Sequence, residues 1–373
     1  MKVVLNIARI FVGVLFIFSG LIKANDPLGL SYKMQEFFEV WGWSALNDYS
    51  LVLSLVMNVF EVVAGIALLV GYRMKLVSWL LFLLIVFFTF LTGYAFLSGK
   101  IKTCGCFGDC VPLTAFQSFL KDLILFVLTL LIVFNYKKIR PVFSPGPSIG
   151  ILLLSVFAVS WMQEHALKHL PFVDCLPYKQ GNNIAEKMKV PPGAIADSSI
   201  MNFTYKHKGQ RVEFDQDHFP DDFDSTYEFV ERHDKLIRQG NATPAIVDFA
   251  LRNDAGDDIT AQVLETPGYY MLVFVKDFGN AGKWMKEEHT QLVQTCLSKN
   301  IPVRYITSEP KKAAHYLDSL AVKDLLICDA TVIKTAARAN PTYFLMNQAT
   351  VYRKISGADI SKMQKAVGEL KAQ

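Results

Sequence analysis

Residues 76–97 read LVSWLLFLLIVFFTFLTGYAFL and contain no acidic or basic side chain. A helix of about 20 apolar residues is long enough to cross the hydrocarbon core of a bilayer. Four more stretches in the same half of the chain have a comparable length and composition: 4–22, 51–71, 114–135 and 147–163. The sequence therefore predicts an integral membrane protein with five spanning helices.

Charged residues divide the chain into two parts. Residues 1–163 hold 12 Lys and Arg with 7 Asp and Glu, whereas residues 164–373 hold 26 and 27. The second part therefore has the composition of a water-soluble domain, and no basic run indicates a nucleic-acid partner. Lys2 precedes the first apolar run, as in a secretory signal. Because this run is long and no small-x-small cleavage site follows it, we expect a retained helix.

The positions of Lys and Arg predict the orientation of the helices. Arg73 and Lys75 lie between the second and third spans, and Lys137, Lys138 and Arg140 lie between the fourth and fifth. Short loops rich in these residues stay in the cytoplasm. We therefore expect a bacterial inner (cytoplasmic) membrane protein with its N-terminus in the cytoplasm and its C-terminal domain in the periplasm.

The soluble part begins with a weakly patterned connector. Two alternating stretches, 203–207 and 210–214, flank Lys208-Gly209 and predict a small hairpin. Nearer the N-terminus, 31–41 has helical spacing and predicts a short helix, lying either at the membrane interface or on the bundle. The predicted organisation is a bundle, a fifth helix with its exit, a connector and a final domain: 1–136, 137–170, 171–242 and 243–373.

The final domain alternates strand-like and helix-like segments. A strand is predicted at 245–251, and the continuous apolar run 269–275 predicts a buried one. The later segments then alternate between helix and strand and end with a hairpin and a helix: 283–297, 302–307, 311–320, 325–328, 330–338, 343–346, 351–355 and 358–370. This order indicates an α/β domain.

The order of these segments, with Asn340-Pro341-Thr342 before the hairpin, resembles the thioredoxin fold. The resemblance implies that Pro341 is cis and faces an active site. The sequence departs from the family where it carries Cys-x-x-Cys, because residues 276–283 read KDFGNAGK. We therefore expect a degenerate thioredoxin-like domain, in which Cys296 and Cys328 are structural.

Three cysteines, Cys104, Cys106 and Cys110, lie in the loop between the third and fourth spans. Outside a bacterial membrane a disulfide is expected, and a Cys-x-Cys bond closes a small, strained ring that is easily reduced. The loop therefore suggests a redox-active site. A structural clip and a soft-metal site for Zn or Cu(I) are alternatives, although a fourth metal ligand is missing. Cys175 would pair with the loop or remain a lone thiol.

The string Cys-Gly-Cys-Phe-Gly at 104–108 resembles the motif of the MauE family. Arg9 with Ser-Gly-Leu-Ile-Lys at 19–23, and Glu-Val-Val-Ala-Gly at 61–65, resemble the related DoxX group. The likeness covers residues 1–136. MauE is thought to act with a thioredoxin-like partner in making disulfides in an exported enzyme, and DoxX-like proteins are associated with thiosulfate–quinone oxidation. The whole architecture resembles DoxX-like proteins of Bacteroidetes with a long soluble tail.

Polar residues also occur inside the predicted spans. An ionisable side chain within a membrane is costly and is usually paired or functional. We expect these groups to lie in the outer half of the bundle, below the cysteines: Lys23, Asn58, Glu61, Lys121 and Asp122. One hypothesis is a polar pocket that moves protons or binds a quinone head group. The alternative is that these groups pair with each other and fix the packing of the helices.

The predicted fold is thus an all-α membrane bundle, with four DoxX/MauE-like helices and a fifth, followed by an α/β thioredoxin-like domain. The first functional hypothesis is thiol–disulfide exchange, with Cys104 and Cys106 as the redox pair, Cys110 as a resolving thiol and quinone as a possible cofactor. The soluble domain would dock a periplasmic client or redox protein, or shield the loop. The alternatives are a non-catalytic envelope scaffold, contacting lipids and other proteins, and a quinone-linked oxidoreductase subunit.

Overall fold

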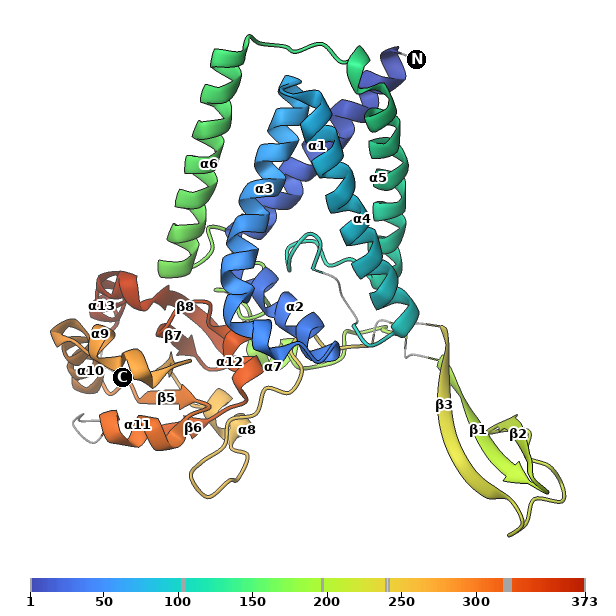
Figure 1. Ribbon diagram of the computed structural model, residues 1–373. Helices are drawn as coiled ribbons and strands as arrows, with labels where there is room; N and C mark the ends of the chain where they lie inside the picture. The colour runs from blue at the N-terminus through green and yellow to red at the C-terminus, as the bar shows by residue number, and fades with distance from the viewer. Residues whose placement is uncertain are drawn as a thin grey trace.

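The computed structural model describes residues 2–101, 105–195, 198–238, 240, 242–317 and 324–371. Within these ranges five helices are long and apolar enough to cross a membrane, which confirms the predicted membrane helices. They are α1 (Lys2–Asn25), α3 (Ser50–Val70), α4 (Met74–Ser98), α5 (Ala115–Asn135) and α6 (Pro145–Lys168). The first four form a bundle, and α6 packs along α1 and α3 at its side (Figure 1).

Local sequence signals set the ends of these helices. The α3 helix ends at Gly71, whose left-handed backbone (φ 77°) is the usual way for a helix to close. Thr114 and Gln117 form a reciprocal capping box at the start of α5. Pro145 occupies the first turn of α6, where a missing backbone N–H costs nothing. The predicted spans therefore needed adjustment by only a few residues.

Glycines allow α1 and α3 to approach each other closely. A Cβ atom on Gly20 would lie 3.1 Å from the Asn58 carbonyl oxygen and 3.1 Å from the Glu61 Cβ. A Cβ on Gly65 would lie 2.8 Å from the Gly13 carbonyl oxygen. Small residues at such crossings let membrane helices pack backbone to backbone. This approach brings the polar end of α1 against Glu61.

A short helix, α2 (Pro27–Val40), and the 3-10 helix η1 (Ser44–Tyr49) connect α1 to α3. Asp26 caps α2 by accepting a hydrogen bond from the Gly29 N–H. The α2 helix lies across the end of the bundle that faces the soluble domain (Figure 1). Trp41, near its end, packs against Phe37 and Tyr94.

A three-stranded antiparallel sheet extends away from the rest of the molecule (Figure 1). Its strands are β1 (Ser198–His207), β2 (Gln210–Asp215) and β3 (Glu228–Arg238), in the order β2-β1-β3. Lys208 and Gly209 turn β1 into β2 with positive φ. The two predicted hairpin strands correspond to β1 and β2. The sequence did not predict β3, because its many charged residues obscure the alternation.

The C-terminal domain is built on a five-stranded sheet with the order β6-β5-β4-β7-β8. Its strands are β4 (Tyr269–Phe274), β5 (Val303–Thr307), β6 (Leu325–Ile327), β7 (Thr342–Asn347) and β8 (Thr350–Ser356). The first three are parallel, whereas β7 is antiparallel to both β4 and β8. Parallel neighbours require crossover helices, which cover the faces of the sheet.

The remaining helices are short. They are α7 (Ile184–Lys187), α8 (Thr260–Leu264), α9 (Ala281–Trp284), α10 (Glu287–Ser298), α11 (Pro310–Leu317), α12 (Ala330–Ala336) and α13 (Ile360–Gly368), with the 3-10 turns η2 (Tyr136–Lys138), η3 (Phe278–Asn280) and η4 (Gly357–Asp359). One apolar cluster includes α12 and the segment before α8, and a second, on α10 and α13, covers the opposite sheet face.

The strand predicted at 245–251 is wrong. This segment is irregular, and Asp248 has a positive φ of 59°, which interrupts an extended chain. Ile246, Phe249 and Leu251 are nevertheless buried in the core. The alternation in the sequence therefore records burial by an irregular segment and not a strand.

Candidate functional site

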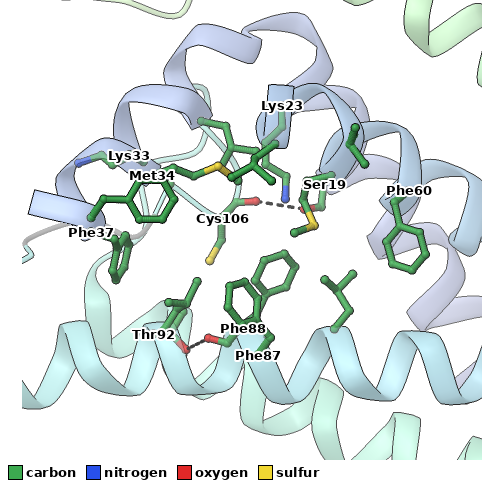
Figure 2. A pocket seen from close by; sticks show the side chains of 18 of the residues that line it. Ser19, Lys23, Lys33, Met34, Phe37, Phe60, Phe87, Phe88, Thr92 and Cys106 are labelled. Atoms are coloured by element: carbon green, nitrogen blue, oxygen red, sulfur yellow. Dashed lines mark hydrogen bonds between the residues drawn. The ribbon is translucent and has the colours of Figure 1, made fainter. Parts of the chain in front are cut away.

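A cavity of about 510 Å³ lies inside the bundle, at the end that carries the cysteine loop. Residues of α1, α2, α3, α4 and α5 line it together with the cysteine loop. Most of its wall is apolar and much of it aromatic, including Phe37, Trp41, Phe60, Phe87 and Phe88. The polar side chains in its wall include Ser19, Lys23, Lys33, Thr92 and Cys106 (Figure 2). Lys121 also lines it. An apolar pocket with a few convergent polar groups is the usual form of a small-molecule site.

Cys106 lies at this cavity and is connected to the membrane helices through its backbone. The Ser19 hydroxyl lies 3.1 Å from the Cys106 carbonyl oxygen and 3.0 Å from Glu61 Oε2. A hydroxyl has one proton, so an ionised Glu61 and the carbonyl compete for it. The Ser19 hydroxyl therefore connects Glu61 on α3 with the backbone of the cysteine loop.

Glu61 is also paired with Lys23. The two side chains form a salt bridge, and both are almost completely buried. The Lys23 ammonium lies 5.2 Å from the centre of the Phe88 ring. Removing one partner of a buried pair leaves an uncompensated charge, which is strongly destabilising. The pair therefore compensates the charge of the Glu61 carboxylate inside the bundle.

A second ion pair joins Lys121 to Asp122 on α5. Asp122 is fully buried and accepts a hydrogen bond of 3.1 Å from the Thr92 hydroxyl. Lys121 lines the cavity, and its ammonium lies 5.3 Å from the centre of the Phe107 ring. The ammonium also interacts electrostatically with Cys106. A cation near a cysteine stabilises its thiolate, which is the reactive form.

Of the five predicted intramembrane residues, four thus lie at the cavity or form an ion pair with a residue that lines it. Lys23 and Lys121 line it, and Glu61 and Asp122 hold those two lysines. Asn58 lies elsewhere, because its amide donates to Gln163 Oε1 on α6 at 3.0 Å. Helical spacing from Glu61 did not predict this partner, which is 105 residues away in the sequence.

Of the three loop cysteines, Cys104 lies outside the described residues. Cys110 forms a disulfide with Cys175, which follows α6. The sequence allowed Cys175 to be either paired with the loop or a lone thiol, and the structure shows that it is paired. In this state Cys110 holds no thiol, so it is not the resolving thiol that the sequence suggested unless the bond opens. A disulfide sulfur is also a poor metal ligand, and no cluster of three metal-binding side chains occurs among the described residues.

The C-terminal domain faces this loop with the turn before β7. The Asn340–Pro341 peptide bond is cis, and the Asn340 side chain accepts a hydrogen bond from the Lys276 backbone N–H at 2.9 Å. Arg338, just before this turn, is 4% exposed and donates to the carboxylates of Asp26 and Asp109. Asp109 immediately precedes Cys110. The turn that carries Pro341 is therefore connected to the cysteine loop by the ion pair between Arg338 and Asp109.

Further polar contacts connect the C-terminal domain to the segment that follows α6. Lys354 on β8 donates a hydrogen bond of 2.7 Å to Asp174, the residue immediately before Cys175. The Lys354 side chain is 3% exposed. His169, after α6, lies 2.8 Å from Asp359. Sequence reasoning missed these contacts, because nothing local in the chain indicates which of many opposite charges will meet. The only signal was the position of Asp109 and Asp174 next to cysteines.

The two cysteines of the C-terminal domain have different surroundings. Cys296 and Cys328 are buried in the two apolar clusters on either side of the sheet. Burial raises the pKa of each thiol to about 12. Neither forms thiolate near neutral pH, so neither supports exchange chemistry.

Comparison with known proteins identifies the bundle. Residues 1–135 match the family model of the methylamine utilisation protein MauE, and residues 200–239 match a domain of unknown function, DUF8463. No curated protein and no solved structure matches the chain. The match and the apolar helices together indicate a protein of a bacterial membrane. The N-terminal bundle is thus similar to MauE, and the chain continues from it into a C-terminal part that contains β-sheets.

Proposed function

We propose that this protein carries out thiol–disulfide exchange at the outer surface of the bacterial inner membrane, with Cys104 and Cys106 as its redox pair. The observation that carries the proposal is the position of Cys106, at an apolar cavity whose polar wall includes Lys23 and Lys121. In such a cavity a thiol can react with a lipid-soluble molecule from the membrane as well as with a water-soluble one. The spacing of Cys104 and Cys106 in the sequence supplies the pair.

The electron acceptor in this proposal is a membrane quinone in the cavity. Oxidation of the Cys104/Cys106 dithiol to a disulfide releases two electrons and two protons, and a quinone takes up both to become a quinol. The aromatic wall suits the ring and the first part of an apolar tail. Lys23 and Lys121 would stabilise negative charge on the quinone oxygens during transfer.

Electrons would enter through the Cys110–Cys175 disulfide. A client dithiol reduces this bond and is itself oxidised. The thiolate released at Cys110 then attacks the Cys104–Cys106 disulfide, Cys175 closes the bond to Cys110 again, and the loop pair is left reduced for the quinone. Cys110 keeps an exchange role in this sequence of steps, as one half of a disulfide.

Glu61 and Ser19 would exchange the protons of this reaction. Their hydrogen bonds connect a buried carboxylate to the Cys106 backbone, and Lys23 holds the carboxylate in place. The alternative is that both ion pairs only fix helix packing. Loss of proton coupling in Glu61→Gln distinguishes the two.

The C-terminal domain, in this proposal, is a thioredoxin-like periplasmic module without a dithiol. Support comes from its sheet order, its parallel and antiparallel strands, and the cis bond at Pro341. Its contacts with Asp109 and Asp174 put it beside the exchange loop, where it would shield the loop or dock a client. The DoxX resemblance of helices α1 and α3 belongs to the same proposal.

The direct test uses the full chain in proteoliposomes that contain a quinone. A reduced dithiol peptide is added outside, and quinol formation is followed by absorbance. We expect turnover that disappears in Cys106→Ser and persists in Cys296→Ala. Absence of quinol formation with a competent quinone would contradict the proposal.

A non-catalytic envelope scaffold is the second candidate. It is favoured by the sequence KDFGNAGK at 276–283, where a thioredoxin-like dithiol is missing. In that case the cysteine loop is a clip, and cysteine-to-serine changes would alter stability without altering the redox state of any client.

A further inference from the structure

A second, smaller cavity lies where the C-terminal domain meets the membrane bundle. Its volume is about 240 Å³, and its lining residues are Tyr32, Lys276, Ser308, Ala330, Ile333 and Lys334. Tyr32 comes from α2 at the end of the bundle, and the others come from the domain. This volume is below the range of about 300–1,000 Å³ typical of sites for larger ligands. The cavity is therefore suited to a small group.

Cations dominate the surroundings of this cavity. The Lys276 ammonium donates to the Arg338 carbonyl oxygen at 2.9 Å, and the Lys334 ammonium lies 5.5 Å from the centre of the Tyr32 ring. Neither lysine forms an ion pair with a carboxylate in the part of the chain that the structure describes. Arg338, beside them, is already bound to Asp26 and Asp109. Among the described residues, these two ammonium groups thus have no directly paired carboxylate.

The electrostatics of Lys276 agree with this geometry. Desolvation by burial, together with the nearby Arg338 and Lys334, lowers the pKa of Lys276 to about 8, although Asp26 acts in the opposite direction. Burial and nearby cations destabilise the charged ammonium form of a lysine. An anion that binds beside the lysine stabilises that form again. Tyr32 and Ser308 also line the cavity, and each of these side chains carries a hydroxyl that can donate a hydrogen bond.

We propose that this cavity binds a phosphate group, held by Lys276 and Lys334 with the hydroxyls of Tyr32 and Ser308. Two cations and two hydroxyl donors match a small tetrahedral oxyanion. The phosphate belongs either to a lipid headgroup, since α2 lies at the end of the bundle, or to a soluble molecule. The site is separate from the cysteine cavity, so the proposal does not depend on exchange activity.

The test uses the full chain in maltoside micelles, which contain no phosphate. Thermal unfolding is measured with increasing sodium phosphate, or with phosphatidylglycerol mixed into the micelles, each against sodium chloride at equal ionic strength. We expect a saturable rise in the melting temperature. Lys276→Gln and Lys334→Gln should each weaken the apparent affinity about tenfold or more, because a charged hydrogen bond is lost.

The control is Lys365→Gln, an exposed lysine of α13 on the opposite face of the sheet. It should respond like the unaltered chain. A response to phosphate alone identifies a soluble ligand, and a response to phosphatidylglycerol alone identifies a headgroup. If neither ligand raises the melting temperature above the chloride control, or if Lys334→Gln responds as strongly as Lys365→Gln, the proposal is wrong. Lys334 is exposed, so its substitution leaves the fold intact.

Discussion

The cysteines of the membrane loop and those of the C-terminal domain lie in opposite kinds of surroundings. Cys106 lies at a cavity beside the Lys121 ammonium, and Cys110 is bonded to Cys175 at the surface of the bundle. Cys296 and Cys328 are packed into apolar clusters, and burial raises the pKa of each to about 12.

The two regions therefore differ in what surrounds their cysteines. In the C-terminal domain the thiols are buried, and Lys276 follows the central strand β4. In the membrane loop a cysteine lies at a cavity whose wall includes lysine side chains. Function therefore has to be argued from the local site and not from the fold.

The largest expected effect separates these two sets of cysteines directly. Cys106→Ser should reduce client oxidation to background, because no thiolate remains at the cavity. Cys328→Ala should stay within about twofold of the unaltered chain, since a buried neutral thiol takes no part in exchange. Oxidation of a dithiol peptide by the purified protein measures both. Equal activity of the two variants would remove the distinction between the regions.

The next effect concerns the contact that joins the two regions. Arg338→Gln leaves Asp26 and Asp109 without their cation and should cost about 3 kcal/mol of local stability. Arg304→Gln, which breaks the more exposed pair with Asp324, should cost less than about 1 kcal/mol. Hydrogen exchange of β7 and of the cysteine loop measures each. Similar protection in both variants would mean that Arg338 does not fasten the domain.

A smaller change is expected at Glu61. In Glu61→Gln the proton exchanged through Ser19 is lost, so the midpoint potential of the loop should shift by about 30 mV and vary less with pH. Glu36→Gln, at the partly exposed pair with Lys33, serves as the control. Redox titration at several pH values distinguishes them. An unchanged potential and pH dependence in Glu61→Gln would leave the ion pairs with a packing role only.

A further effect is a pH dependence of the C-terminal domain. The pKa of Lys276 is lowered from 10.5 to about 8, so the unfolded chain binds more protons between these values. Stability should therefore rise with pH in this window, by about 1 kcal/mol per pH unit. Lys276→Met should remove this rise, whereas Lys365→Met should keep it. Thermal unfolding from pH 7 to 10 provides the measurement, and parallel curves for both variants would contradict the shifted pKa.

Sequence alone predicted what depends on local composition. The five membrane helices follow from apolar runs such as 76–97, and the turn at Lys208-Gly209 follows from its residues. The two wrong predictions have a common cause: the pattern of apolar and charged residues does not by itself determine the backbone conformation. The segment 245–251 alternates because an irregular chain buries its apolar residues, and β3 is charged enough to resemble a connector.

The candidate site was predicted only in part for the same reason. Polar residues inside apolar spans stand out, so Glu61, Lys23, Lys121 and Asp122 could be named from the sequence. Their partners depend on which helices pack together, as the hydrogen bond from Asn58 to Gln163 on α6 shows. The Arg338–Asp26 contact spans 312 residues, and the Cys110–Cys175 bond was one of several possible pairings.

The most direct test of the account is alkylation trapping of the loop cysteines in membranes across a series of defined redox potentials. The account predicts that Cys104 and Cys106 titrate reversibly, at a potential above the roughly −300 mV that marks resistant structural disulfides. Cys296 and Cys328 should remain thiols throughout. Loop cysteines that stay oxidised at every potential would contradict the central claim, and the protein would then be a scaffold with a structural clip.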